Sequence, residues 1–164
     1  SHNLAGNVKK EVSIDHMAIK GLPEFLATIS QEYTKRVLPD YLPEGTKVAF
    51  RVWAVSQWAG DFNPIHIHDS NLSGVCFLKI PPKFDEEYSK EDHHPTAGCL
   101  EFIGSVPNHF ARHSFLAKPE VGDFYIFPSW LTHQVYPFRS EGERRSMAFN
   151  VHFTMENPVK GVNV

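Results

Sequence analysis

The sequence predicts a mainly β protein, a sandwich or barrel of short strands, with one amphipathic helix on its N-terminal side. Three observations predict it. Apolar runs with strand-like alternation recur between Lys47 and Phe153. Proline and glycine separate these runs, and the chain contains 12 prolines and 10 glycines. Its 13 phenylalanines strengthen the strand signal, because aromatic residues fit the half-buried surface of a sheet.

The order of the elements can be read from the apolar pattern. A helix is expected over Leu22–Val37, where apolar residues recur at the spacing of one helix face, and we expect that face to pack on the outside of a sheet. Strands are expected at residues 47–58, 74–80, 98–103, 115–118, 124–127, 130–136 and 144–153. Residues 1–12 show no period. Residues 81–95 are expected to form a polar loop that carries His93 and His94 at the surface.

Length and charge narrow the functional classes. At 164 residues the chain is most simply one domain, 1–164, with its core at about residues 47–155. A formal charge of −3 gives no strong field for nucleic acid or acidic membranes, and no apolar run reaches membrane-spanning length. Cys76 and Cys99 lie in strand-like runs, which favours free thiols in a reducing compartment. We therefore expect a cytoplasmic location, with neither nucleic acid nor a membrane as partner.

The segment from Asn63 to Asp69 carries the main chemical signal. If a strand begins at or before Ile65, the side chains of His66 and His68 point to the same face, because strand residues two apart share a side. Two neutral imidazoles on one face can bind one divalent cation through bonds of about 2.0–2.2 Å. The alternative is one hydrogen-bonded core histidine beside a solvated one.

The last expected strand presents two unlike faces. One is apolar after its first residue and consists of Arg145, Met147, Phe149, Val151 and Phe153. The other is small and polar and consists of Arg144, Ser146, Ala148, Asn150 and His152. We expect the apolar face to lie under the helix and the polar face to look inward, where an arginine is costly unless an anion pairs with it. A carboxylate ligand meets that need, as does an Asp or Glu of the protein itself, whereas an Arg144 that frays into solvent has no such need.

Along the chain, His66-x-His68 stands before a strand, His133 follows, and Arg144-x-Ser146 comes after it. In order and spacing these residues resemble the 2-oxoglutarate/Fe(II)-dependent oxygenase superfamily. The phrases Leu72-Ser73-Gly74-Val75 and Gly122 to His133 are similar to a small branch of that superfamily, and the likeness covers about residues 53–153. It implies a double-stranded β-helix (jelly roll) core with the helix packed outside.

The resemblance also implies a role for four of these residues. His66 and His133 would be iron ligands. Arg144 would pair with the distal carboxylate of 2-oxoglutarate, and Ser146 would hydrogen-bond the same carboxylate.

The third metal ligand is where the sequence departs from the superfamily. His68 stands where a carboxylate is usual, so it would complete a three-histidine site that is one unit more positive than two histidines and one carboxylate. A bulge after His68 would instead turn Asp69 inward as the third ligand. Asn63 and Asn150 are candidates for hydrogen bonds to the ligands or the substrate.

The function that the resemblance implies is an Fe(II)- and 2-oxoglutarate-dependent oxygenase, a hydroxylase whose primary substrate the sequence does not name. Fe(II) would be its cofactor, and 2-oxoglutarate and O2 its cosubstrates. Two alternatives stay open. One is a cupin-like metalloenzyme that uses three histidines without 2-oxoglutarate. The other is a non-catalytic jelly-roll binding module whose histidines are structural.

Overall fold

The computed structural model describes residues 8–39, 45–90, 95–104, 110 and 112–154. Its elements are β1 (Lys10–Ser13), a 3₁₀ turn (His16–Ala18), α1 (Leu22–Val37), β2 (Lys47–Gln57), β3 (Asn63–His66), β4 (Leu72–Lys79), α2 (Phe84–Lys90), β5 (Leu100–Ile103), β6 (Ser114–Ala117), β7 (Phe124–Pro128), β8 (Thr132–Val135) and β9 (Arg144–Thr154). Within these residues no helix is long and apolar enough to cross a membrane.

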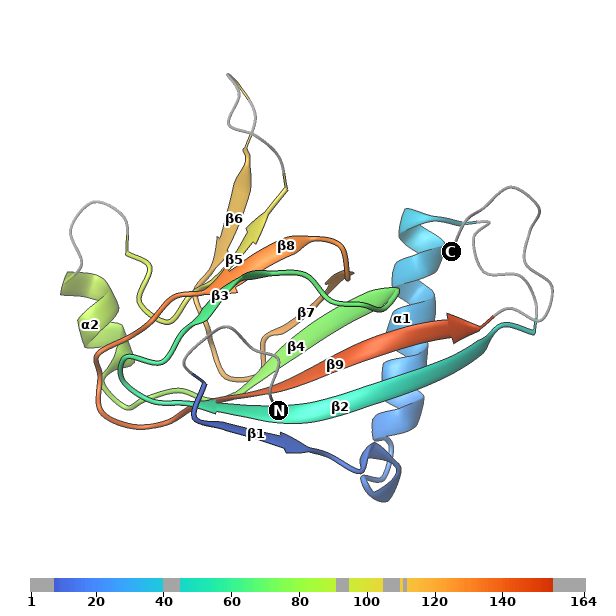
Figure 1. The fold of residues 1–164 in the computed structure, drawn as a ribbon, viewed down its shortest axis with the longest axis horizontal. Coiled ribbons are helices and arrows are strands. Elements are labelled where there is room, and N and C mark those ends of the chain that lie inside the picture. Colours follow the sequence, from blue (N-terminus) through green and yellow to red (C-terminus); the bar gives the residue numbers. More distant parts are fainter. Residues whose placement is uncertain (1–7, 40–44, 91–94, 105–109, 111, 155–164) are drawn as a thin grey trace.

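Two antiparallel sheets form the molecule. The larger has the strand order β1-β2-β9-β4-β7, and the smaller has the order β3-β8-β5-β6 (Figure 1). Neighbours in the larger sheet come from distant parts of the chain, since β9 lies between β2 and β4. Such long-range antiparallel pairing in two facing sheets is typical of a jelly roll, and the predicted mainly β fold is confirmed.

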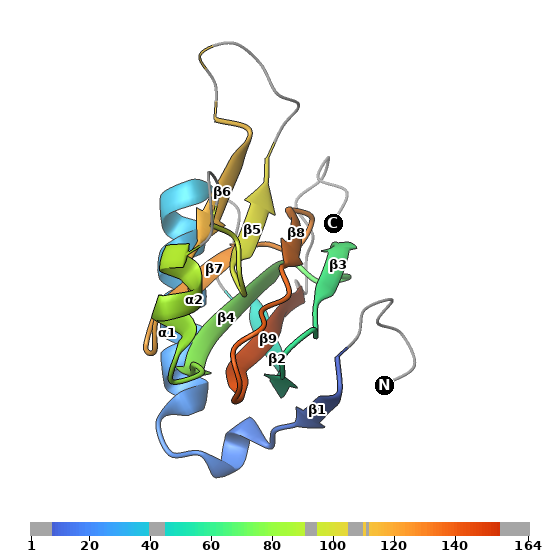
Figure 2. The same ribbon diagram turned by 90° about the vertical axis from the view of Figure 1, so that its left-hand side faces the viewer.

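The helix α1 covers the outer face of the larger sheet and has the bounds that the sequence predicts. Figure 2 shows α1 on one side of that sheet and the smaller sheet on the other. Leu26 of α1 is fully buried against a cluster that includes Val52, Phe149 and Val151. The helix therefore contributes packing, because its apolar stripe removes the outer face of β2 and β9 from water.

The close approach of β4 and β9 depends on Gly74. A Cβ at this position would lie 2.2 Å from Cζ of Phe149 and 2.8 Å from the carbonyl oxygen of Tyr125. The ring of Phe149 occupies that space and stacks on Phe124 with 5.4 Å between the ring centroids. Glycine is required here because any side chain would displace the ring from the centre of the outer core.

A second apolar cluster fills the space between the two sheets. Its buried members are Phe77, Leu100, Phe102, Ala117 and Phe127. They come from β4 and β7 of the larger sheet and from β5 and β6 of the smaller one. This cluster holds the sheets together next to the region where the polar face of β9 looks inward.

Two elements differ from the sequence-based expectation. Residues 1–12 show no period in the sequence, yet β1 pairs with β2 at the edge of the larger sheet. Such a short, polar edge strand has no hydrophobic period to find. The expected loop at 81–95 contains the helix α2, and Glu87 of α2 accepts hydrogen bonds from the backbone N–H groups of Arg139 and Ser140, both at 2.7 Å. His93 and His94 lie outside the described residues.

Neither Cys76 nor Cys99 forms a disulfide, as the sequence predicts. Cys76 is half-buried within β4, and Cys99 is fully buried just before β5. Burial raises the pKa of the Cys76 thiol, and Asp123 adds to that effect. The thiol therefore stays protonated and behaves as a small apolar side chain.

Candidate metal centre

Three histidines meet at one end of the space between the sheets. One nitrogen each from His66, His68 and His133 lies within 4.8 Å of the other two. The Nε2 atoms of His68 and His133 are 3.2 Å apart, and the ring centroids of His66 and His133 are 4.2 Å apart. The structure thus brings together residues that the sequence separates by more than half of the described core.

The backbone explains this convergence. His66 ends β3 and lies directly opposite His133 of β8, so their side chains share the inner face of the smaller sheet. His68 lies beyond the end of β3, where the sequence analysis expected a continuing strand. Its backbone N–H donates to the carbonyl of Ser129 at 3.0 Å, and this bond rather than strand pairing holds His68 beside the other two rings.

Hydrogen bonds fix the orientation of two of the rings. The Nδ1 atom of His66 lies 2.7 Å from the carbonyl oxygen of Pro64, and Nδ1 of His133 lies 2.8 Å from that of Leu131. A carbonyl oxygen only accepts, so each Nδ1 carries the proton. In the neutral rings the lone pair is then on Nε2, and a metal-binding histidine is commonly held in this way.

Burial keeps the imidazoles of His68 and His133 neutral. Desolvation, together with the neighbouring His133 and His66, lowers the pKa of His68 to about 4. Desolvation likewise lowers the pKa of His133 to about 4, against the opposing effect of its bond to the Leu131 carbonyl. Neutral rings at physiological pH can donate lone pairs to a metal without first losing a proton.

The donor set fits a divalent transition metal. Two ligands at right angles around one ion, with bonds of about 2.1 Å, lie about 3 Å apart, which agrees with the 3.2 Å between the Nε2 atoms of His68 and His133. Imidazole suits iron, and three ligands on one side leave the other positions open. Asp69 is exposed in the bend after His68 and is not part of the group of three.

Aromatic rings surround the cluster. The ring of Phe127 packs edge-on against His133 at 4.9 Å between centroids, and Phe102 lies 6.3 Å from the same ring. Trp53 meets the edge of His68 at 6.2 Å. These apolar walls exclude water from one side of the imidazoles, which strengthens electrostatic interactions inside the site.

Arg144 lies deep on the inner face of β9 and has no carboxylate partner among the described residues. Only 2% of its surface is exposed. Its Nη1 donates to Oε1 of Gln57 at 2.5 Å, its guanidinium lies 4.9 Å from the ring centre of Phe77, and its Nε has no hydrogen-bond acceptor. Burial lowers the pKa of Arg144 to about 10, so the group remains charged at neutral pH. A buried cation of this kind favours an anionic ligand.

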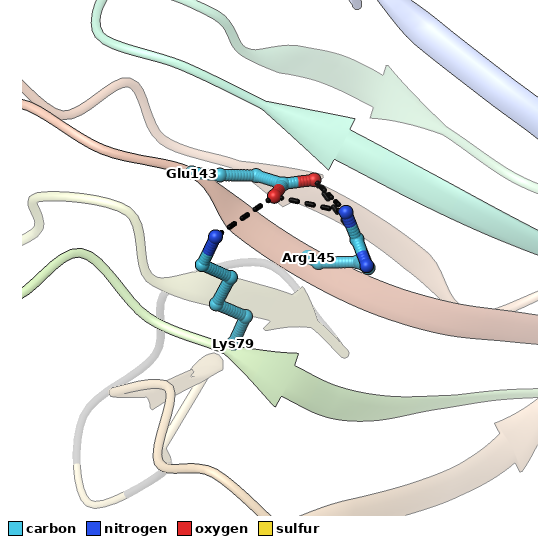
Figure 3. A network of polar contacts seen from close by, with 3 residues as sticks. All are labelled: Lys79, Glu143 and Arg145. Atoms are coloured by element: carbon cyan, nitrogen blue, oxygen red, sulfur yellow. Dashed lines mark hydrogen bonds and ion pairs between the residues drawn. The ribbon is translucent and has the colours of Figure 1, made fainter.

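The carboxylate nearest in sequence is used elsewhere. Glu143 lies 3.1 Å from Nζ of Lys79 and 2.8 Å from Nη2 of Arg145, at the start of β9 (Figure 3). A hydrogen bond from Ser56, together with Lys79 and Arg145, lowers the pKa of Glu143 to about 2. Glu143 therefore neutralises the exposed Arg145 and leaves Arg144 without an internal counter-ion.

The other predicted residues are distributed around this centre. Ser146 is buried on the inner face, two residues along β9 from Arg144. Asn150 is further along the same face and accepts a hydrogen bond from Ser73 at 2.9 Å. Asn63 is in β3 outside the histidine group, and its buried Oδ1 has no partner among the described residues.

Sequence reasoning missed Gln57 and Ser129. Gln57 is brought to Arg144 by the register of β2 against β9, and a single sequence does not state which strands pair. The Ser129 hydroxyl lies 2.5 Å from that of Ser70 and 2.9 Å from that of Ser73. This buried hydroxyl chain links the bend that carries His68 to the inner face of β4, and serine at a turn gives no signal that distinguishes it from an ordinary loop residue.

Solved structures with similar folds include prolyl hydroxylases. The chain is similar to a prolyl-4-hydroxylase from Pseudomonas putida, with 18% identity, a TM-score of 0.57, and coverage of 87% of this chain and 70% of that one. It is similar to the viral collagen prolyl hydroxylase of Paramecium Bursaria Chlorella virus-1, solved with 2-oxoglutarate, with 13% identity, a TM-score of 0.54, and coverage of 93% and 80%. A prolyl hydroxylase from Trichoplax adhaerens, solved with a peptide fragment of the hypoxia inducible factor oxygen degradation domain, has 15% identity, a TM-score of 0.53, and coverage of 87% and 62%. At these identities the likeness concerns the fold.

The family comparison is more specific. No curated protein sequence matches the chain. The model of the family described as "Putative 2OG-Fe(II) oxygenase" matches residues 51–150, which is more than half of the chain and includes all three histidines and Arg144. Enzymes of this family use Fe(II) and 2-oxoglutarate, so the resemblance seen in the sequence is confirmed. The chain belongs to this family of 2OG-Fe(II) oxygenases.

Proposed function

We propose that this oxygenase is a hydroxylase of the dioxygenase type, with His66, His68 and His133 as the ligands of Fe(II). The convergence of the three imidazole rings supports these ligands, and the exposed position of Asp69 favours His68 as the third one. The single observation that carries the assignment is the distance of 3.2 Å between the Nε2 atoms of His68 and His133, which suits two ligands of one ion.

We further propose that Arg144 binds the distal carboxylate of 2-oxoglutarate and that Ser146 donates a hydrogen bond to it. Both side chains are buried on the inner face of β9, and the guanidinium lacks a carboxylate partner within the described residues. A bidentate carboxylate would neutralise the buried charge and fill the empty hydrogen-bonding position on Nε. The chain would then bind a diacid better than a monoacid.

In this mechanism the bound iron supplies the oxidation of a C–H bond at the expense of 2-oxoglutarate and O2. The protein orients the imidazole rings and the cosubstrate and shields the site from water. Pro64 and Leu131 hold the rings of His66 and His133 with Nε2 facing the metal. Arg144 fixes one end of the cosubstrate, and the aromatic residues around His133 limit the access of water. The fold likeness to prolyl hydroxylases supports hydroxylation as the reaction outcome.

The assignment is tested by following the conversion of 2-oxoglutarate to succinate with and without Fe(II). We expect turnover that requires both iron and oxygen and that disappears in Arg144→Ala. His133→Ala should lose stoichiometric metal in elemental analysis while His152→Ala, an exposed histidine of β9, keeps it. Unchanged turnover in Arg144→Ala, or a full metal content in His133→Ala, would contradict the roles that we propose.

A three-histidine metalloenzyme that does not use 2-oxoglutarate is the second candidate, because the metal-ligand group contains no carboxylate. The effect of 2-oxoglutarate on the melting temperature distinguishes the two functions. A ligand that binds only the folded protein raises its melting temperature. Added 2-oxoglutarate should stabilise the metal-loaded protein if our proposal holds, whereas a metalloenzyme of the second kind should bind metal and show no such shift.

A further inference from the structure

The contact between Gln57 and Arg144 fixes how both side chains are oriented. A guanidinium has only donors, so the amide oxygen of Gln57 must face it, as the 2.5 Å bond from Nη1 to Oε1 shows. The amide nitrogen of Gln57 cannot bond the guanidinium, which has no acceptor atom, so its N–H groups need another acceptor. Gln57 and Arg144 are direct neighbours in the register of β2 and β9, so both project from the inner face of the larger sheet.

Two donors at this contact have no acceptor. Nε2 of Gln57 and Nε of Arg144 are both buried and both without a hydrogen-bond partner among the described residues. Buried donors in native proteins almost always have partners, so two such donors on adjacent residues indicate a ligand with acceptor atoms. Because Nη1 is already bonded to Gln57, the edge of the guanidinium that carries Nε remains for that ligand.

The charge of the contact restricts the ligand further. Gln57 is neutral and only 1% exposed, and the side chain of Phe77 covers one face of the guanidinium. A glutamate in place of Gln57 would have given Arg144 an internal counter-ion and removed the need for an anion. The neutral amide accepts from the guanidinium, offers its own N–H groups, and leaves the positive charge uncompensated.

We propose that Gln57 is a cosubstrate-binding and specificity residue, whose amide N–H donates to the distal carboxylate of a 2-oxo diacid while its amide oxygen holds Arg144 in position. The inference rests on the proposed function and adds a residue that discriminates diacids from monoacids. The carboxylate accepts from the two donors that otherwise have no partner. A 2-oxo acid without a distal carboxylate leaves both donors unpartnered and binds more weakly.

The test compares Gln57→Glu and Gln57→Met with the parent protein. Each is loaded with Mn(II) without oxygen and titrated by calorimetry with 2-oxoglutarate and, separately, with pyruvate. Gln57→Glu should lose affinity for 2-oxoglutarate by roughly 100-fold, through repulsion and through capture of Arg144. Gln57→Met should lose roughly 10-fold, the equivalent of one hydrogen bond to a charged group. Affinity for pyruvate should stay within roughly 3-fold in both, because the metal-binding end of the ligand is untouched.

Gln134→Met is the matched control. Gln134 is on β8 and bonds Glu101 and Tyr136, so the same substitution there should leave the ratio of the two affinities unchanged. An unchanged ratio in both Gln57 variants overturns the inference, and so does an equal loss for both acids, which would mean a purely structural role. If Gln57→Glu fails to fold, the ratio in Gln57→Met decides alone. If the parent protein does not bind 2-oxoglutarate, the proposed function itself fails.

Discussion

Both faces of β9 carry buried side chains, but the buried groups on the two faces differ in chemistry. Phe149 and Val151 on the outer face are fully buried under α1. Arg144 and Ser146 on the inner face are only 2% and 4% exposed. The apolar side chains on the outer face pack against other side chains of the protein and have no hydrogen-bonding groups that need a partner. The inner face keeps a charge and donors that have no partner among the described residues, which is why we propose that it binds a ligand.

This difference separates stability from binding within a single strand. Substitutions on the outer face should lower the free energy of unfolding and leave ligand selectivity intact. Substitutions on the inner face should change ligand selectivity without lowering the free energy of unfolding. The reason is that a site arranged to bind a charged ligand reduces the stability of the protein.

The largest effect on stability is expected from Phe149→Ala. The ring fills the space above Gly74 and stacks on Phe124, so its loss leaves a cavity in the outer core. We expect the free energy of unfolding in urea to fall by about 3–5 kcal/mol. In protein that remains folded, the ratio of affinities for 2-oxoglutarate and pyruvate should not change. A loss below about 1 kcal/mol would mean that α1 and β9 are less tightly packed than the structure indicates.

The double variant Gln57→Leu/Arg144→Met should lose ligand binding and keep its stability. Replacing both partners of a buried polar contact by apolar groups is often neutral or stabilising, by up to about 4 kcal/mol. We therefore expect an unchanged or higher free energy of unfolding together with complete loss of 2-oxoglutarate binding. The single variant Arg144→Met is the control, since it leaves Oε1 of Gln57 without a donor and should be less stable than the double variant. A double variant that unfolds more easily than the single one would contradict this account.

Acid should destabilise the metal-free protein through His68 and His133. The pKa of His68 and of His133 is about 4 in the folded protein, below the ordinary value of 6.5. Between these values the unfolded chain binds more protons than the folded one, so stability is full above pH 6.5 and is lost as the pH falls toward about 4. Urea unfolding at several pH values checks this. The slope should be smaller in His133→Asn, which cannot titrate, and an equal slope would exclude His133 as a source.

The smallest effect is expected from Glu143→Gln. The carboxylate contacts Lys79 and Arg145, whose side chains are 54% and 48% exposed, so water and salt weaken both ion pairs. We expect a loss of at most about 1 kcal/mol in the free energy of unfolding, reduced further in high salt. Affinity for 2-oxoglutarate should not change, although Glu143 directly precedes Arg144. A large loss of that affinity would mean that the Glu143 network also positions Arg144.

The sequence by itself determined the parts of this protein that depend on local periodicity. The helix over Leu22–Val37 has the predicted bounds, and the two faces of β9 follow from simple alternation, because side-chain direction in a helix or strand depends only on spacing. The His66 and His68 candidates came from their spacing on an expected strand, and Arg144 came from the cost of burying an unpaired charge. The sequence did not predict the strand β1 or the helix α2. Pairing with β2 stabilises the first and the contacts of Glu87 stabilise the second, and neither interaction appears in a local pattern.

The tertiary structure alone decided which residues meet. The register of β2 on β9 placed Gln57 against Arg144, and the pairing of β3 with β8 placed His66 opposite His133. The hydrogen bond from the backbone N–H of His68 to the carbonyl of Ser129 holds the third imidazole beside the other two, beyond the end of β3. Strand pairing depends on the combined packing of the whole core. One sequence therefore indicates which residues are candidates for binding, and the fold determines which of them lie together in one site.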